Sequence, residues 1–210
     1  MPSLKRWLGG NTDALVLRVF PFAAHLPLSP DALSLLGAVL SGAAGAAFYL
    51  DRVLAGAALL ALAGWCDLVD GVVARRRGQA TLAGGFTDSS LDRLADMLVF
   101  GGIALGGAAR GQVLLCFLAL WAATAAVLVS YTRARAEVHL HRLDQGLFGR
   151  FERFAVLLAG ALTGWLEPTL ALLALGTSVT AIGRLRTGRR LLAELERTGI
   201  DPTAPPSEPR

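Results

Sequence analysis

Long apolar segments separated by short polar connections dominate the chain from residue 32 onward. A helix that crosses a bilayer needs about 20 mainly apolar residues, and fewer where the bilayer is thin. The pattern predicts six such helices: Ala32–Leu50, Val53–Val73, Phe86–Ala109, Gln112–Tyr131, Phe154–Leu166 and Thr169–Ile182. The last two are short and meet at Glu167-Pro168, where the proline is expected to end the preceding helix. The expected fold is therefore an all-α polytopic membrane protein.

The segments on either side of this region have a different pattern. In residues 1–30, Gly, Asn, Thr and Asp interrupt the apolar positions, which excludes a cleavable signal peptide. We expect an N-terminal interfacial helix whose apolar residues face lipid: Trp7, Leu8, Leu15, Val16, Val19 and Phe20. Residues 31–187 would then form the six-helix domain. Residues 188–210 would form a C-terminal tail that is disordered over Asp201–Arg210.

Composition agrees with a membrane protein and excludes several other classes. Of the 210 residues, 54% are hydrophobic and 17% are charged, with a mean hydropathy of +0.53. An ordinary soluble domain has about 25% charged residues. A disordered chain, a disulfide scaffold and a water-soluble globule are therefore excluded, and we expect no nucleic-acid partner. The 24 glycines suit close helix–helix approach, and Cys66 and Cys116 are expected to be small core residues.

Positive charge is distributed very unevenly between the two sides of the predicted bundle. Of the 20 lysines and arginines, only Arg52 and Arg110 fall on the side of the first, third and fifth connections. The other 18 fall on the side of the termini and of the second and fourth connections. Because cytoplasmic loops are enriched in Lys and Arg, we expect a multi-pass protein of the cell membrane with both termini in the cytoplasm.

Five aspartates lie in or at the ends of these apolar helices, where an ionised carboxylate costs roughly 2.5–3.5 kcal/mol. Asp67 and Asp70 are three residues apart, and Asp88, Asp92 and Asp96 are four apart. Each set therefore lines one face of its own helix. The connection between the two helices is short, which predicts that they are antiparallel neighbours whose acidic faces meet at the cytoplasmic end.

Four carboxylates at one depth cannot all stay ionised without cations. Oxygen ligands without His or Cys favour Mg²⁺ or Mn²⁺, and two such ions form the usual clamp for phosphoryl displacement. Gly71 and Ala74, with Gly84 across the connection, would let a phosphate ester approach the backbone, and Arg75 would bind a diphosphate. Each piece alone has a simpler interpretation, as a helix-end carboxylate or a topogenic arginine run. The spaced string D-x2-D-G-x2-A-R-x8-G-x3-D-x3-D, from Asp67 to Asp92, is far more specific.

This string resembles the signature of the CDP-alcohol phosphatidyltransferase family, with no departure. The resemblance implies six transmembrane helices, a homodimer, and an active site that opens toward the cytoplasm. It also implies one displacement: the acceptor hydroxyl attacks the lipid-side phosphorus of a CDP-linked lipid such as CDP-diacylglycerol, and CMP leaves. Under this resemblance the metal ligands are Asp67, Asp70, Asp88 and Asp92, with Asp92 also the general base.

The same resemblance assigns the remaining residues of the string to the CDP-lipid. Gly71, Ala74, Arg75 and Gly84 would line the CDP pocket. Thr81 and Asp31 fall where the family contacts the nucleotide. Asp96 lies outside the signature and is expected only to support the metal ligands.

The acceptor is indicated by arginines at helix ends on the same side as the aspartates. Arg133, Arg153 and Arg184 stand where the inositol-phosphate branch of this family holds its acceptor's phosphate, and guanidinium groups suit a dianionic phosphate. Topogenic anchoring also explains such arginines. The chain has Arg133 where the family often has Lys, and Phe151 where close relatives have Pro. Inositol phosphate is therefore the favoured acceptor, and glycerol 3-phosphate is the alternative.

Two other classes also place acidic residues in a membrane. An ion- or proton-coupled transporter would hold them near the midplane, in helices repeated between two halves. Here they gather at one end of two adjacent helices, and no repeat is evident. A non-catalytic scaffold with a degenerate site should lack a signature aspartate, and all of them are present.

Overall fold

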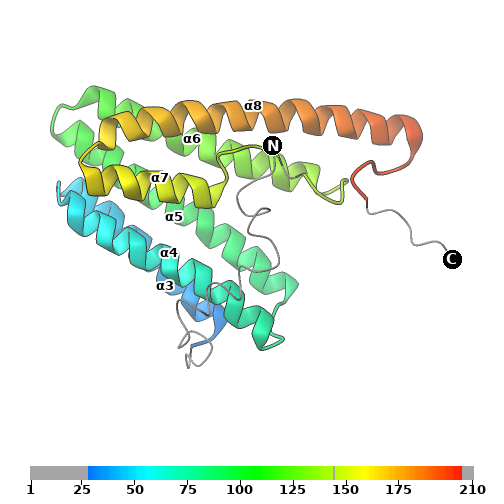
Figure 1. Cartoon of the computed structure of the whole chain (residues 1–210), viewed down its shortest axis with the longest axis horizontal. Coiled ribbons are helices and arrows are strands. Elements are labelled where there is room, and N and C mark those ends of the chain that lie inside the picture. The colour runs from blue at the N-terminus through cyan, green and yellow to red at the C-terminus, as the bar shows by residue number, and fades with distance from the viewer. Residues whose placement is uncertain (1–27, 144, 205–210) are drawn as a thin grey trace.

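A computed structural model describes residues 28–143 and 145–204, and the predicted interfacial helix lies almost entirely outside them. Within these ranges the chain is helical (Figure 1), which confirms the all-α prediction. The helices are α3 (Pro30–Tyr49), α4 (Val53–Arg76), α5 (Leu82–Ala109), α6 (Val113–Ala136), α7 (Arg150–Thr163) and α8 (Leu166–Thr198).

Length and composition qualify four of the described helices to cross a membrane: α3, α4, α6 and α8. α5 is long enough, but it carries four charged residues, Asp88, Asp92, Arg93 and Asp96. α7 has only 14 residues, fewer than a perpendicular span requires. A helical membrane protein is thus established, and the six-span count stays a prediction.

The turn between α7 and α8 lies earlier than the sequence pattern indicated. Gly164, with φ 74°, ends α7 in the left-handed conformation, which glycine adopts without a Cβ penalty. α8 then begins at Leu166, so Glu167 and Pro168 lie in its first turn. The predicted turn at Glu167-Pro168 is wrong, because a proline in the first helical turn lacks only an N–H that would have no partner there.

α8 continues well beyond Ile182, the predicted end of the last span, to Thr198. Its C-terminal half packs on the end of α6 and the following loop through a separate apolar cluster: Ala136, Leu140 and Leu143 against Leu191, Leu192 and Leu195. Beyond the helix, the Asp201 carboxylate accepts a hydrogen bond from the His141 amide at 2.5 Å. The Thr203 hydroxyl accepts one from the Arg142 amide at 3.2 Å. Residues 201–204, where the sequence pattern predicts disorder, are thus hydrogen-bonded to the loop after α6, and residues 205–210 lie outside the described chain.

The helices form two groups that lie close at one end and diverge at the other (Figure 1). α3 packs against both α4 and α5, whereas α6 packs against α5 and α8, and α7 against α8 and α4. Glycines allow the closest approaches, since a Cβ on Gly102 of α5 would collide with the backbone of Gly45 of α3. A Cβ on Gly64 of α4 would collide with the Phe154 ring of α7. α4 and α5 do not pack along their lengths, because α3 lies against both of them, but their acidic faces meet at the divergent end, as the sequence predicts.

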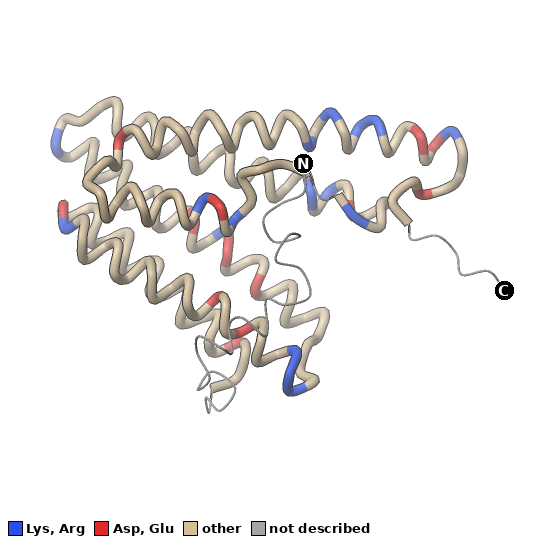
Figure 2. Tube along the Cα trace, in the orientation of Figure 1, with Lys and Arg blue, Asp and Glu red and all other residues tan. Residues whose placement is uncertain are grey.

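Among the described cations, Arg52 and Arg110 lie at the closed end of the bundle, and the others lie toward the divergent end (Figure 2). Arg110 also ties the turns of the closed end together, because it donates to the Tyr49 carbonyl at 2.8 Å. It lies 3.6 Å from the Asp51 carboxylate. The charge asymmetry inferred from the sequence is therefore present in the folded chain.

Candidate active site

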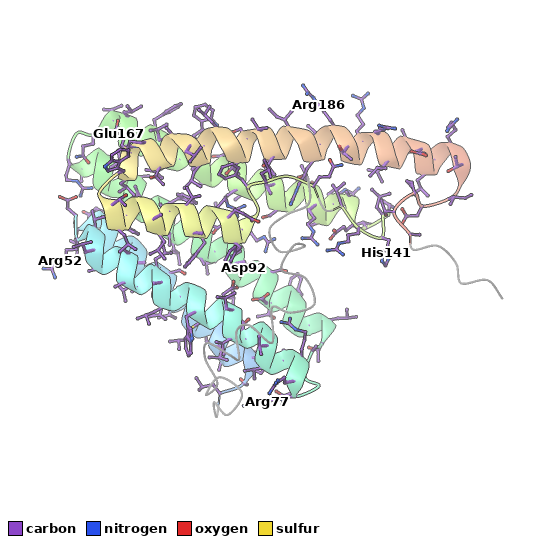
Figure 3. The ribbon with its side chains drawn as sticks, in the orientation of Figure 1. Arg52, Arg77, Asp92, His141, Glu167 and Arg186 are labelled. Atoms are coloured by element: carbon purple, nitrogen blue, oxygen red, sulfur yellow. The ribbon has the colours of Figure 1, made fainter. Side chains whose placement is uncertain are left out.

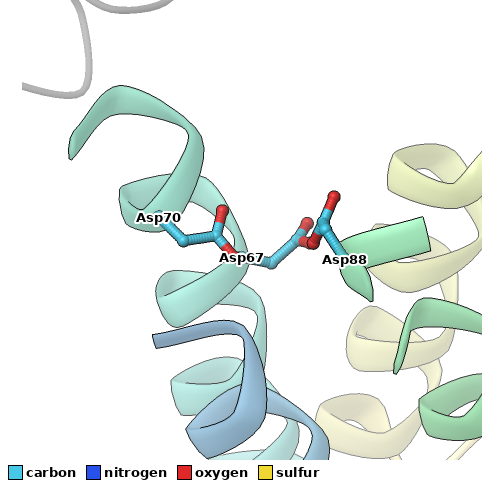
Figure 4. Close-up of side chains that lie close together, drawn as sticks. All are labelled: Asp67, Asp70 and Asp88. Carbon is cyan, nitrogen blue, oxygen red and sulfur yellow. The ribbon is translucent and has the colours of Figure 1, made fainter. Parts of the chain in front are cut away.

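Three aspartates from two helices meet at the divergent end of the bundle (Figure 4). Asp67 and Asp70 on α4 and Asp88 on α5 each offer a carboxylate oxygen, and these oxygens lie within 4.8 Å of one another. Asp70 is 6% exposed, and the Ser34 hydroxyl of α3 donates to its Oδ2 at 2.7 Å. The three-residue spacing on α4 aims both of its carboxylates at α5. This oxygen-only donor set is one that hard divalent cations prefer.

The cluster opens into a cavity between α3, α4, α5 and α7. The five aspartates of α4 and α5 named in the sequence analysis line it, together with Arg150 and Arg153. Five carboxylates against two guanidinium groups leave an excess of three negative charges when all are ionised. Farther in, the lining becomes apolar, with Leu60, Phe100 and Leu157 among its residues. The cavity thus joins a cation-attracting region to a surface suited to an apolar chain.

Asp92 lies one turn beyond Asp88 on α5 and is outside the three-carboxylate cluster (Figure 3). Its Oδ1 pairs at 2.6 Å with Nη1 of Arg150. The same Nη1 donates to Asp67 Oδ1. Arg150 therefore connects the fourth signature aspartate to the cluster.

Arg150 is a site residue that the sequence interpretation missed. It is the first residue of α7 and reaches both α4 and α5. Burial alone would lower the pKa of its guanidinium, but the carboxylates of Asp67 and Asp92 raise that pKa above its usual range. One signal was available, because Arg150 precedes Arg153 by three residues and so shares its helix face.

Arg153 is buried, at 3% exposure, and binds a neighbouring carboxylate. Its Nη2 donates to Asp96 Oδ2 at 2.6 Å, and its Nη1 to the Phe148 carbonyl at 3.3 Å. Its Nε is buried without a hydrogen-bond partner among the described residues. Asp96, expected only to support the metal ligands, thus forms a second carboxylate–arginine link between α5 and α7.

The other two arginines predicted to bind the acceptor contact protein groups away from this pair. Arg184 of α8 donates to the Gln145 carbonyl at 2.6 Å and to the Val129 carbonyl at 2.9 Å. Arg133 of α6 pairs with Glu137 at 2.9 Å. Of the three arginines, only Arg153 lines the cavity. In this structure Arg184 fixes the segment that leads into α7.

The residues predicted to contact the nucleotide meet at the start of α5. Thr81 caps that helix by accepting a hydrogen bond from the Gly84 amide at 3.0 Å. A Cβ on Gly84 would lie 3.1 Å from Thr81 Oγ1 and 3.5 Å from Asp31 Oδ1. The beginnings of α3 and α5 therefore bring Asp31, Thr81 and Gly84 together.

On α4, Gly71 lies beside the Arg75 side chain. A Cβ there would lie 3.1 Å from Nη1 of Arg75, so the glycine leaves room for this guanidinium to fold back along the helix. Ala74, the other small residue of the string, is half-buried on the same helix.

A helical membrane bundle with this spaced string and a convergent acidic cluster defines a class of membrane transferases. The model of the CDP-alcohol phosphatidyltransferase family matches residues 27–182, and the chain belongs to this family. It is 40% identical over 153 residues to the archaetidylinositol phosphate synthase of Methanothermobacter thermautotrophicus, covering 72% of this chain and 76% of the relative. It is 37% identical to the phosphatidylinositol phosphate synthase of Streptomyces avermitilis, covering 91% and 86%.

Solved structures agree with these relatives. The crystal structure of Mycobacterium tuberculosis phosphatidylinositol phosphate synthase with CDP-DAG bound is 29% identical, with a TM-score of 0.71 over 84% of this chain and 92% of that one. The same enzyme in complex with manganese and citrate also has a TM-score of 0.71, over 85% and 88%. Membership in this family sets the transporter and scaffold interpretations aside.

Proposed function

We propose that the protein transfers the phosphatidyl group of CDP-diacylglycerol to a hydroxyl of inositol phosphate and releases CMP. The observation that carries this proposal is the meeting of Asp67, Asp70 and Asp88 in a cavity that also holds Asp92. The family match and the synthases named among its relatives support the reaction class and the acceptor.

The acidic residues fit Mg²⁺ or Mn²⁺, because all donors are oxygens and the cavity has an excess of negative charge. Asp67, Asp70 and Asp88 would hold the metal, with Asp92 as a further ligand if two ions bind. Bound divalent cations would neutralise the diphosphate and favour departure of the nucleotide phosphate. A solved relative in complex with manganese supports this choice of ion.

In the proposed reaction, Asp92 accepts the proton of the attacking hydroxyl. The acceptor oxygen forms a bond to the phosphorus that carries diacylglycerol, and the bond from this phosphorus to the oxygen bridging it to the CMP phosphate breaks. CMP leaves with that oxygen, so one P–O bond replaces another. Asp31, Thr81 and Gly84 would contact the nucleotide, while Gly71, Ala74 and Arg75 would line the same pocket on α4. The apolar part of the cavity would accept acyl chain.

For the acceptor's phosphate, the structure favours Arg153 among the three predicted arginines, because it lines the cavity and its Nε lacks a partner among the described residues. Arg133 and Arg184 would have to leave their present partners to contribute. We further propose that the divergent, arginine-rich end faces the cytoplasm, because cytoplasmic loops are enriched in Lys and Arg, and that the protein works as a homodimer. Glycerol 3-phosphate stays the alternative acceptor.

A panel of acceptors tests this proposal. The purified protein, CDP-diacylglycerol and Mg²⁺ are incubated with inositol phosphate, glycerol 3-phosphate, serine or inositol, and CMP release is measured. We expect the highest kcat/KM with inositol phosphate and loss of activity with EDTA. A preference for glycerol 3-phosphate would leave the chemistry intact but replace the acceptor, whereas CMP release from none of the four would contradict the function.

The assigned base is tested in the same assay. Asp92→Asn should lower kcat by at least about 100-fold, because the amide cannot take up the proton, while the variant still binds CDP-diacylglycerol. Ser89→Ala, at an exposed position on the same helix, is the matched control and should keep normal turnover. Near-normal kcat in Asp92→Asn would remove Asp92 from the role of base.

A further inference from the structure

One guanidinium nitrogen lies between carboxylates of two different helices. Nη1 of Arg150 donates to Asp67 of α4 and pairs at 2.6 Å with Asp92 of α5. α5 packs against α3 and α6, and α7 packs against α8 and α4. Arg150 therefore reaches across the cavity to bridge two aspartates of the signature.

This position has the electrostatic character of a cation site. The side chains involved are partly solvated, with 32% exposure for Arg150, 37% for Asp67 and 16% for Asp92. Without Arg150 the ionised cavity lining would have an excess of four negative charges instead of three. A permanently charged guanidinium thus lowers the repulsion between carboxylates.

We propose that Arg150 is a positioning residue that holds Asp67 and Asp92 together in the metal-free protein and is displaced from them when a divalent cation binds. The inference rests on the proposed function, because it assumes that these carboxylates serve a metal. A carboxylate oxygen that accepts from a guanidinium is a poorer ligand until that contact breaks. Arg150 and the cation therefore compete for the same two side chains.

This competition between Arg150 and the cation predicts two opposite effects of removing the guanidinium, one on the stability of the metal-free protein and one on its affinity for the metal. Removing the guanidinium should destabilise the metal-free protein, because the carboxylates then repel one another. The same change should tighten binding of Mn²⁺ by roughly tenfold or more, because the ion no longer displaces a cation and meets a more negative site. A guanidinium that only tethers α7 would produce the first effect without the second.

The test uses the full chain in detergent, without substrates. Mn²⁺ affinity is measured by EPR of the free ion, and the Tm is recorded with and without Mn²⁺, for the wild type and for Arg150→Gln. Arg186→Gln, at an exposed position on α8 (Figure 3), removes the same charge far from the cavity and is the matched control. Arg150→Lys is a second variant, because its compact, strongly hydrated ammonium keeps the charge but not the guanidinium geometry that bridges the two carboxylates.

We expect Arg150→Gln to have a lower Tm without metal, a larger rise of Tm with Mn²⁺, and a lower Kd for Mn²⁺. Arg150→Lys should fall between it and the wild type, and it carries the test if Arg150→Gln does not fold. Arg186→Gln should match the wild type in all three measurements. Unchanged or weaker Mn²⁺ affinity in the folded Arg150 variants would overturn the inference while leaving the proposed metal site intact. Failure of the wild type to bind Mn²⁺ would overturn both.

Discussion

The buried pair between Arg153 and Asp96 gives a quantitative prediction about the link between α7 and α5. The two side chains meet at 2.6 Å, and the exposed fraction of the side chain alone is 4% for Arg153 and 24% for Asp96. Arg153→Met keeps much of the aliphatic volume but removes the charge, and Asp96→Asn removes the opposite charge at nearly constant shape. Together they form a double-mutant cycle.

The magnitude follows from the burial of the two partners. Breaking a buried ion pair from one side costs about 3–5 kcal/mol, because it leaves an uncompensated charge. Asp96 is partly solvated, so we expect Arg153→Met to cost less, about 2–3 kcal/mol. Asp96→Asn should cost at least as much, because it leaves the more deeply buried guanidinium without its anion. Once one partner is absent, removing the other should cost little, which corresponds to a coupling free energy of about 2 kcal/mol.

Reversible unfolding in mixed detergent micelles measures these free energies for the wild type, the two single variants and the double variant. Arg133→Met is the control, because Arg133 pairs with Glu137 at the end of α6, and its side chain is 42% exposed. Exposed pairs of this kind contribute about 1 kcal/mol or less. Additive effects of the two substitutions, with a coupling near zero, would refute the reasoning that this pair holds α7 against α5.

Two further predictions concern the packing and the C-terminal segment. Gly102→Val should destabilise the protein by several kcal/mol, because its Cβ would collide with the Gly45 backbone. The control is Gly101→Val, whose Cβ meets nothing within 4 Å. Equal Tm values for the two variants would contradict the close approach of α5 to α3. Hydrogen bonds from Thr203 and the His141 amide lower the pKa of Asp201. The ionised Asp201 carboxylate therefore stabilises the position of residues 199–204 fully at a pH above its ordinary pKa, and this stabilisation is lost as the pH falls through the lowered pKa. Limited proteolysis of this segment should therefore accelerate at acid pH in the wild type, whereas Asp201→Ala should be cleaved rapidly at every pH; pH-independent cleavage of the wild type would refute this.

Several features of the fold could be predicted because they depend on short-range geometry. Apolar runs of about 20 residues identify α3, α4 and α6 to within a few residues, apart from the polar last turns of α4 and α6. Three- and four-residue spacings are sufficient to place Asp67 with Asp70, and Asp88 with Asp92, on common helix faces. The boundary at Gly164 was missed, because Pro168 is compatible both with ending one helix and with lying in the first turn of the next.

The local sequence specifies the helical membrane class, the uneven charge of the two ends and the carboxylates that form the acidic cluster. These features follow from the periodicity of each helix and from the free energy of transferring its side chains from water to the membrane, and both act within one segment. Only the packing of the helices decides that α3 lies on both α4 and α5. The same packing lets Arg150 bridge Asp67 and Asp92. It also brings the Arg184 guanidinium to backbone carbonyls. The arginine contacts join residues 39 to 83 positions apart in the chain. These contacts depend on how closely the helices approach at one end of the bundle and how far they diverge at the other. The glycine contacts and the cavity lined by α4 and α5 reflect this spacing between helices, which no local sequence pattern encodes.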